Sequence, residues 1–296
     1  MATELRYRDL VLDGWNLRVL PERWSNELWH CLLNHIREQV SRRHPQTAMV
    51  NFFEKGERHR LFLKTFHPAS YWGGIKDWFR DSKALRFLKQ GVALSDAGFL
   101  VPITIAAGEE RCLGILKRAF VVTLGMDGAP LPTFLSEGCS TAIAGIPLVE
   151  KRNGLRTLAR QIRRFHDLGF IHGDLVPSNI LVHRVPAIGL QFYFMDNDRT
   201  RRFPKWLPQI FWKRNLVQLN RFPLPSITLQ DRMRFFRAYL GAQDSSEANR
   251  RLLHWLEAKT RQRRRECDRV DTTGSFRKLM SWQNSSLPTA NHGKHQ

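Results

Sequence analysis

The chain has 296 residues, of which 42% are hydrophobic and 11% are aromatic. This length and composition exclude a disordered chain and suffice for one large domain or two small lobes that share a cleft. Lysine and arginine number 47 against 27 acids, so the formal net charge is +20. Such a charge attracts anions, which include nucleotides, phosphorylated sugars, nucleic acid and anionic membranes. It does not indicate which of these the protein binds.

The four cysteines are Cys31, Cys112, Cys139 and Cys267, and none of them forms a C-x-x-C pair. We therefore expect neither a disulfide framework nor a zinc site, and a reducing cytosol fits best. Charged residues near the start argue against a secretory signal. The longest apolar stretches, such as residues 99–107, are about half the length of a membrane span. We expect a protein that is soluble or peripheral to a membrane.

The first part of the chain is predicted to be rich in strands. Strand-like runs flank a turn at Lys55 and Gly56, and a helix follows that ends at Gly98 before two further strands. The expected strands are residues 49–53, 61–66, 101–107 and 119–124, and the expected helix is 81–97. Gly125, Gly128 and Pro130 then break the pattern. These signals predict an N-terminal lobe over residues 1–125.

The second part is predicted to be mainly helical. A helix over residues 148–168 begins just after Pro147, where a missing N–H costs nothing. A loop at 172–179 is followed by a small hairpin formed by 180–183 and 191–195. The clearest later helices are residues 229–240 and 248–263. We expect a helical catalytic lobe over 126–270 and a loosely ordered tail over 271–296.

The segment from His172 to Asn179 has the pattern H-x-D-x-x-x-x-N. Phosphoryl transfer needs a carboxylate that orients the attacking hydroxyl and receives its proton, and Asp174 is placed for that role. It also needs oxygen ligands for Mg²⁺, which Asn179 and, one short strand later, Asp196 would supply. His172 is expected to brace the loop from behind. The pattern predicts the catalytic centre of a phosphotransferase.

Lys64 lies in an apolar strand, where its ammonium group needs a partner to offset the cost of burial. In a kinase cleft the natural partner is an ATP phosphate, and the alternative is a lysine at a sheet edge that faces water. Read with the downstream loop, Lys64 is predicted to anchor ATP. Asp198 and Arg199 are expected to fix the loop that carries Asp196, with direct metal binding by Asp198 as an alternative.

Three segments together resemble the lipopolysaccharide core kinase family, the Kdo/heptose kinases of Gram-negative bacteria. They are F-H-D-L-G-F-I-H-G-D-L at 165–175, S-N-I-L-V at 178–182 and M-D-N-D-R at 195–199. The resemblance covers residues 45–242, with weaker matches that include K-R-N-L at 213–216. The H-G-D form and the D-x-D-R ending are more similar to the Kdo kinases than to the heptose kinases.

The resemblance implies an α+β, bilobal protein-kinase-like fold, in which a small N-terminal antiparallel-sheet lobe with one main helix precedes a larger helical lobe. It implies that Asp174 is the base, that Asn179 and Asp196 hold Mg²⁺, and that Lys64 anchors ATP. Leu181 is also expected among the nucleotide-binding residues. The implied reaction is ATP-dependent phosphorylation of a sugar hydroxyl, with Kdo favoured, on the lipid-linked saccharide of the lipopolysaccharide inner core. The implied location is the cytoplasmic face of the inner membrane.

Two departures from the kinase pattern stand out. Kinases usually pair the strand lysine with a glutamate of the following helix, whereas this helix reads Arg86-Phe87-Leu88 at the matching turn. Lys64 is then expected to pair with Asp196, with phosphate alone or with another acid. A glycine-rich loop is also missing, since the first hairpin offers only Gly56.

A basic and aromatic segment follows Arg199, at residues 201–206 and 211–214. Its cations would hold phosphates and carboxylates of a saccharide and an anionic membrane surface, while its aromatic residues either reach the headgroups or pack the helical lobe. A second basic run at 261–265 is expected to be a solvated helix face, and nucleic acid is not the expected partner.

Other functions stay open on the sequence alone. They are a kinase of another acceptor, such as a protein or a small molecule, a catalytically silent kinase-like binding protein, and a nucleic-acid-binding module. Gly173, at a position where eukaryotic-type protein kinases usually carry arginine, argues against regulation by a phosphorylated activation loop. Intact Lys64, Asp174, Asn179 and Asp196 argue against the silent protein. No feature of the sequence indicates an oligomeric state.

Overall fold

A computed structural model describes residues 7–39, 47–54, 57–67, 80–137, 147–186, 188–204, 210–222, 224, 227–241 and 247–270. Three predictions lie outside these residues: the turn at Lys55 and Gly56, the surface role of Lys205 and Trp206, and the loosely ordered tail at 271–296.

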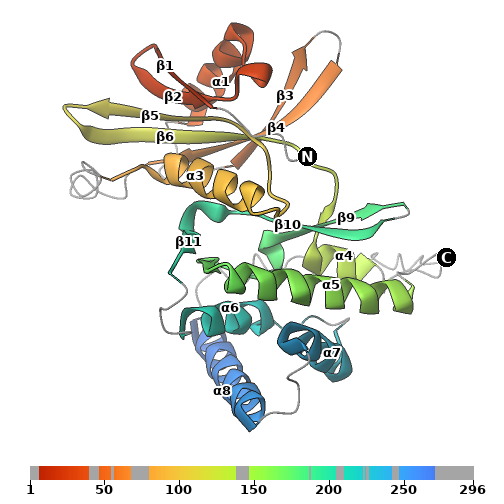
Figure 1. The fold of residues 1–296 in the computed structure, drawn as a ribbon. Coiled ribbons are helices and arrows are strands. Elements are labelled where there is room, and N and C mark those ends of the chain that lie inside the picture. The colour runs from red at the N-terminus through yellow and green to blue at the C-terminus, as the bar shows by residue number, and fades with distance from the viewer. Residues whose placement is uncertain are drawn as a thin grey trace, which may run out of the picture.

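A six-stranded antiparallel sheet forms the N-terminal part of the chain (Figure 1), in the order β1-β2-β5-β6-β4-β3. Its strands are β1 (Arg8–Leu12), β2 (Trp15–Val19), β3 (Thr47–Glu54), β4 (Glu57–Phe66), β5 (Thr104–Cys112) and β6 (Ile115–Leu124). The predicted hairpin is confirmed as β3 and β4. Because β4 pairs with β3 on one side and with β6 on the other, Lys64 lies within the sheet, opposite Thr47 and Val121. The alternative of an edge-strand lysine is therefore wrong.

Each face of this sheet is covered by a helix. Helix α1 (Asn26–Gln39) packs on one face through a cluster that includes Trp29 and Leu32, and α3 (Lys83–Asp96) packs on the other through Phe87 and Leu88. Strand alternation produces both faces, since Leu61 and Leu63 point to the first cluster and Phe66 to the second. The expectation of one main helix was therefore incomplete, because α1 was not predicted.

The predicted strand at 101–107 is shifted in the structure. Strand β5 begins at Thr104, after Pro102, which has no N–H to donate to a ladder. It continues to Cys112 through the polar residues Glu109 and Glu110, because β2 and β6 pair with it on both sides. Pairing with neighbouring strands thus extends β5 beyond the apolar run that marked it in the sequence.

Residues 125–128 connect the sheet to the helical part. The N–H of Gly125 donates a 2.6 Å hydrogen bond to the carbonyl of Arg60, and a Cβ at Gly125 would lie 2.6 Å from that same oxygen. Gly128 has a φ of +138°, and a Cβ there would lie 2.5 Å from the carbonyl oxygen of Val182. The two glycines therefore allow the connection to lie against the backbone of both parts.

The C-terminal part is a group of helices around a second core. They are α4 (Leu131–Glu137), α5 (Leu148–Asp167), α6 (Ile210–Asn220), α7 (Leu229–Leu240) and α8 (Glu247–Val270). Helix α5 confirms the predicted helix, and its buried residues Leu155, Leu158, Ile162 and Phe165 follow helical spacing. Figure 1 shows α6 and α7 below α5, with α8 below α6. None of the helices in the described ranges is long and apolar enough to span a membrane.

Short strands lie where the two parts meet. The order of one small sheet is β10-β9-β7, and β8 pairs with β11. The strands are β7 (Ala129–Pro130), β8 (Phe170–Ile171), β9 (Ile180–Val185), β10 (Gly189–Phe194) and β11 (Arg201–Arg202). The predicted second hairpin is thus confirmed as β9 and β10. A hydrogen bond of 2.9 Å from the N–H of Phe194 to the carbonyl of Leu100 joins β10 to the segment after α3.

Candidate active site

The structure brings Lys64 of β4 against Asp196, which follows β10. The Nζ atom of Lys64 donates a 2.5 Å hydrogen bond to Oδ1 of Asp196, and the exposed fractions of the two side chains are 25% and 38%. Asp196 is one of the partners expected for Lys64. The pair also links the sheet to the helical part of the molecule.

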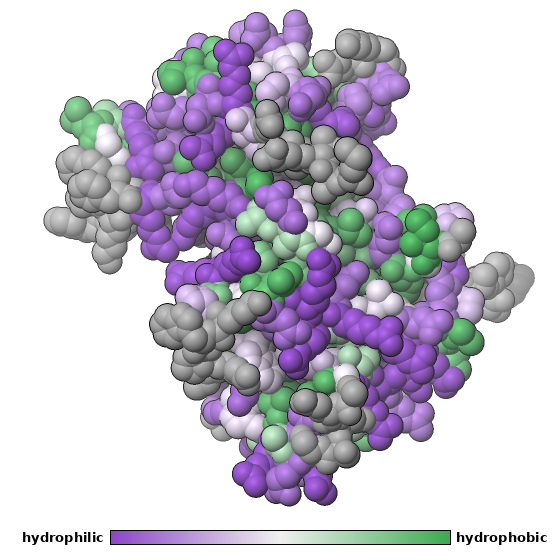
Figure 2. All heavy atoms as spheres, viewed as in Figure 1, coloured by the Kyte–Doolittle hydropathy of each residue, from purple (hydrophilic) through white to green (hydrophobic). Residues whose placement is uncertain are grey.

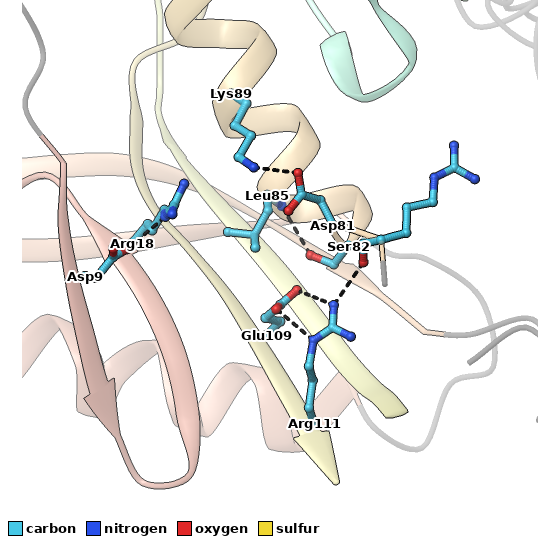
Figure 3. A network of polar contacts seen from close by, with 9 residues as sticks. Asp9, Arg18, Asp81, Ser82, Leu85, Lys89, Glu109 and Arg111 are labelled. Atoms are coloured by element: carbon cyan, nitrogen blue, oxygen red, sulfur yellow. Dashed lines mark hydrogen bonds and ion pairs between the residues drawn. The ribbon is translucent and has the colours of Figure 1, made fainter. Parts of the chain in front are cut away.

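Two acids near the start of α3 are engaged with other cations (Figure 3). Asp81 accepts a hydrogen bond from Lys89, and Glu109 of β5 pairs with Arg111. Since the only acid of α3 is Asp96 at its end, this helix supplies no carboxylate at the turn Arg86-Phe87-Leu88, where kinases usually have one. The pairing of Lys64 with Asp196 is consistent with that lack.

Asp196 has a left-handed backbone conformation, with φ 55° and ψ 53°. For a residue other than glycine this costs about 1 kcal/mol, and such conformations cluster at functional sites. Both neighbours hold it in place. The N–H of Met195 donates to the carbonyl of Asn179 at 2.8 Å, and the amide of Asn197 donates to the carbonyl of Phe194 at 2.9 Å.

His172 is fully buried and holds two backbone segments together. Its Nε2 lies 2.9 Å from the carbonyl of Met195, and its Nδ1 accepts a 3.2 Å hydrogen bond from the N–H of Asp174. A carbonyl only accepts, so the proton must be on Nε2. Burial lowers the pKa of His172, which keeps the ring neutral. His172 thus sets the spacing between the loop with Asp174 and the residue before Asp196.

Asp174 is half-buried at the centre of this loop. In the part of the chain that the structure describes, no hydrogen bond or ion pair engages its carboxylate, whereas its N–H bonds to His172 and its carbonyl accepts from Asn179. A carboxylate whose backbone is fixed and whose oxygens are available can accept a proton from a hydroxyl placed beside it.

Asn179 lies in the short 3₁₀ turn Pro177–Asn179. Its Nδ2 donates a hydrogen bond of 2.9 Å to the carbonyl of Asp174. The Nδ2 side of the amide therefore faces that carbonyl, and Oδ1 is on the other side. Its own carbonyl accepts from Met195, the residue before Asp196. The two oxygen donors, an amide and a carboxylate, fit Mg²⁺, which takes one or two protein ligands and completes its shell with phosphates and water.

Asp198 lies near other charged side chains of the site that contains Lys64 and Asp196. Burial and the negative charge of Asp196 raise the pKa of Asp198, while Lys64, Arg199 and Lys83 of α3 lower it. Perturbed pKa values cluster at functional sites, and networks of ion pairs perturb them as well. Both the structural role and the metal-binding role of Asp198 are compatible with this position.

Gly173 has almost no space for a side chain. A Cβ at this position would lie 2.6 Å from the carbonyl oxygen of Arg199, and the Cβ of Arg199 would be in contact with it. Steric crowding by Arg199 therefore explains why a glycine lies between His172 and Asp174, and this contact could not be inferred from the sequence alone. The loop and the turn after Asp196 lie directly against each other.

Helix α6 contributes two residues that the site predictions did not include. Asn215, which is 1% exposed, accepts from the N–H of His172 and donates to its carbonyl. Gln218 accepts from the N–H of Leu175 and donates to the carbonyl of Gly173. The K-R-N-L match at 213–216 was a signal for Asn215, but its contact with the loop depends on tertiary packing.

Leu181 lies on β9, opposite Pro130 of β7 and Tyr193 of β10. A Cβ at Gly128 would touch its Cδ2 at 2.8 Å. Leu181 is thus half-buried beside the connection between the two parts. This position is compatible with the predicted contact to the nucleotide.

The basic segment after Arg199 is partly exposed and partly packed. Arg201 and Arg202 of β11 are exposed. Phe211 stacks on Phe203, with ring centroids 5.1 Å apart, and the ring of Trp212 lies 5.9 Å from that of Tyr239. These contacts favour packing of the helical part as the role of Phe211 and Trp212.

Comparisons with known proteins point to one family and one fold. A model described as the lipopolysaccharide kinase (Kdo/WaaP) family matches residues 35–239. A solved structure described as WaaP in complex with acyl carrier protein superposes with a TM-score of 0.52 at 20% sequence identity, over 73% of this chain and 85% of that one. This likeness supports the kinase-like fold. No curated protein matches the chain.

Proposed function

The chain belongs to the lipopolysaccharide kinase (Kdo/WaaP) family, and from this premise we propose that it transfers the γ-phosphoryl group of ATP to a sugar hydroxyl of the lipopolysaccharide inner core, with Kdo as the acceptor. The single observation that carries this proposal is the 2.5 Å contact between Lys64 and Asp196, because it joins the phosphate-binding cation and the metal-binding acid at one point. The loop with Asp174 adjoins that point through His172 and Met195.

In this proposal Asp174 orients the acceptor hydroxyl and takes its proton as the oxygen attacks the γ-phosphorus. Its carboxylate is suited to this role because His172 and Asn179 fix its backbone and leave its oxygens available. The γ-phosphoryl group leaves the β-phosphate of ATP, so ADP and a phosphorylated sugar are the products. Phosphoryl transfer depends mainly on positioning and charge stabilisation, and a rigid loop provides the positioning.

Asn179 and Asp196 would hold Mg²⁺ through an amide oxygen and a carboxylate oxygen. When bound, the cation neutralises charge on the β- and γ-phosphates. Lys64 then has a second anion within reach, and we propose that it moves from Asp196 to the phosphates when nucleotide binds. Leu181 and the connection at Gly125–Gly128 would contact the base of the nucleotide.

We also propose peripheral attachment to an anionic membrane surface on the cytoplasmic face of the inner membrane. Arg201 and Arg202 are exposed beside the loop that carries Asp174, since β11 pairs with β8. On the face drawn in Figure 2, hydrophilic residues dominate and hydrophobic residues gather only in small groups. Attachment would then be electrostatic, at about 1 kcal/mol for each cation near the surface, and it would weaken in salt.

The test of the proposed function is phosphate transfer to a defined acceptor. Purified protein, Mg·ATP and lipopolysaccharide cores with and without Kdo are mixed, and mass spectrometry follows the gain of one phosphate. Transfer that requires Kdo supports the proposal. Transfer to a core that lacks Kdo would assign a different sugar, and transfer only to a protein or a small molecule would assign the alternative class of kinase.

A separate observation favours a binding role for the helical part. An apolar cavity of about 450 Å³ lies among α4, α5, α6, α7 and α8, and Leu131, Leu158, Phe236 and Leu256 are in its wall. Arg232, Arg261 and Arg264 also line it. The similar structure is described as bound to acyl carrier protein, and we propose that this cavity takes an acyl chain. Failure of a fluorescent fatty acid to bind, or unchanged binding by Leu158→Trp, would contradict this second proposal.

A further inference from the structure

Four side chains from three helices form one continuous hydrogen-bonded path to the loop that carries Asp174. Tyr239 of α7 contacts His166 of α5 at 2.9 Å, and His166 contacts Asn215 of α6 at 3.2 Å. Asn215 in turn donates to Gln218 at 3.0 Å. Asn215 and Gln218 then bond to main-chain N–H and carbonyl groups of the loop, where the path ends.

The direction of each bond follows from simple accounting of donors and acceptors. Oδ1 of Asn215 accepts from the N–H of His172, so the amide nitrogen is the donor to the carbonyl of His172 and to Oε1 of Gln218. Oδ1 can also accept from Nε2 of His166, which places the proton of His166 on Nε2. Nδ1 of His166 is then the acceptor for the hydroxyl of Tyr239.

The loop therefore receives one donor and one acceptor from each of two amide side chains. Asn215 bonds to both backbone groups of His172, while Gln218 bonds to the carbonyl of Gly173 and to the N–H of Leu175. These contacts lie on both sides of Asp174. Replacing either amide by a carboxylate of the same shape would keep the hydrogen-bond acceptor and remove the donor. Such a substitution therefore tests the hydrogen bond without changing the shape of the side chain.

We propose that Asn215 and Gln218 are positioning residues for the phosphoryl-transfer reaction, and that His166 and Tyr239 set the orientation of the Asn215 amide. The four residues act through the backbone of the loop and touch neither nucleotide nor acceptor. The inference rests on the proposed kinase function only for its activity readout. Its hydrogen-bond directions are testable without any substrate.

The activity test compares Asn215→Asp and Gln218→Glu with wild type in transfer from Mg·ATP to Kdo-containing lipopolysaccharide core. We expect kcat to fall about 10²-fold, because small misplacement of a catalytic group has an effect of that size, while the Kd for Mg·ATP stays unchanged. The matched control is Asn220→Asp on the same helix, whose side chain contacts Thr260 of α8 and not the loop. Wild-type kcat in both Asn215→Asp and Gln218→Glu would overturn the proposal.

A pH profile distinguishes positioning from a loss of folding. Protonation of the new carboxyl in Asn215→Asp restores a donor toward the carbonyl of His172, so its activity relative to wild type should rise as pH falls. The titratable residues that contact this position are His166 and His172. Arg163 and Asp167 act on His166, and Asp174 and Asp196 act on His172. A relative activity that does not change with pH in a folded Asn215→Asp variant would count against the donor role. Gln218 is only half-buried, so Gln218→Glu tests the proposal if the buried variant does not fold.

Nitrogen-15 NMR of labelled histidine gives a readout that is independent of the kinase function. We expect His166 in the wild type to be a neutral ring with its proton on Nε2, and Tyr239→Phe to shift its Nδ1 signal. A proton on Nδ1 of His166 would overturn the path, whether or not the protein phosphorylates lipopolysaccharide. If the NMR result holds and wild type transfers no phosphate to any core, the proposed function fails while the hydrogen-bonded path stands.

Discussion

Lys64 in the sheet and Asp196, 132 positions later in the sequence, are joined by a hydrogen bond of 2.5 Å. In kinases the lysine of the corresponding strand usually pairs with a helix glutamate, but the only acid of α3 is Asp96 at its end. In this structure the cation that would hold phosphate and the acid that would hold the metal therefore neutralise each other. Binding of Mg·ATP would give each of them a new partner of opposite charge.

Replacement of Asp196 tests the metal-binding role. We expect Asp196→Ala to abolish the Mg²⁺-dependent part of ATP binding, because a carboxylate supplies much of the affinity of a protein for this hard cation. Isothermal titration of ATP with and without Mg²⁺ measures the effect. The control is Asp9→Ala, which removes an aspartate that pairs with Arg18 on the outer hairpin of the sheet (Figure 3). Unchanged Mg·ATP affinity in Asp196→Ala would remove this residue from the metal site.

Replacement of Asp174 tests the base. We expect Asp174→Asn to lower kcat by about 10²–10⁴-fold, since an amide cannot accept the proton of the acceptor hydroxyl. ATP affinity should stay near that of wild type, because the backbone contacts of this residue are retained. The control is Asp167→Asn, which affects an exposed ion pair with Arg163 on α5. Turnover near the wild-type rate in Asp174→Asn would contradict the assignment.

Gly173 offers a test of the close contact between the loop and Arg199. We expect Gly173→Ala to lower the free energy of unfolding by about 1–3 kcal/mol and to reduce turnover, because the new Cβ would force two backbone segments apart. Gly91→Ala in α3 is the matched control, since a Cβ there meets only the hydroxyl of Thr104, at 4.0 Å. It should stabilise the protein by about 0.5–1 kcal/mol. Chemical unfolding measures both, and equal effects would show that crowding at Gly173 is not the cause.

Acid should destabilise the protein through His166. Burial lowers the pKa of His166 from 6.5 to about 4, so between these values the unfolded state binds more protons than the folded state. The free energy of unfolding then rises with pH through this window, and about 3 kcal/mol is lost as pH falls from 6.5 to 4. We expect His166→Gln to show a shallower dependence when unfolding is measured at several pH values. Identical slopes would indicate that His166 is not buried in its neutral form.

Surface attachment is tested with vesicles that contain anionic lipid. We expect Arg201→Ala combined with Arg202→Ala to weaken binding, and salt to weaken binding of the wild type, because exposed cations are screened. The matched control removes the same charge from α8 through Arg250→Ala and Arg251→Ala, which are also exposed. Binding that is insensitive to salt, or equal in the two double variants, would contradict the assignment of this surface to β11.

The sequence predicted those features that depend on local pattern. The second hairpin, α5 and the segment around His172 follow directly from periodicity and motif spacing. The pairing of Lys64 was left open among several partners, because it depends on a tertiary contact between β4 and the segment after β10. Asn215 was visible only as part of a weak match, since its role comes from contact with a loop 43 positions earlier in the chain.

Strands β1 and β2 and helix α1 were not predicted, although their apolar residues alternate or repeat with the expected periods. Trp15, Leu17 and Val19 alternate along β2, and Leu28 and Leu32 lie one turn apart on α1. Strand β2 has only five residues, and polar or charged residues stand between the apolar positions of α1. Their stability comes from packing against each other and against β6, which no local pattern reports.

The glycines at 125 and 128 have a consequence for inhibition. Gly125 lies against the backbone of Arg60 in the sheet, and Gly128 lies against that of Val182 in the helical part. A connection fixed at both of its ends resists bending, so its exposed edge should keep nearly one shape whether or not a nucleotide is bound. A compound designed to that edge would meet a preorganised surface and would spend little of its affinity on ordering it.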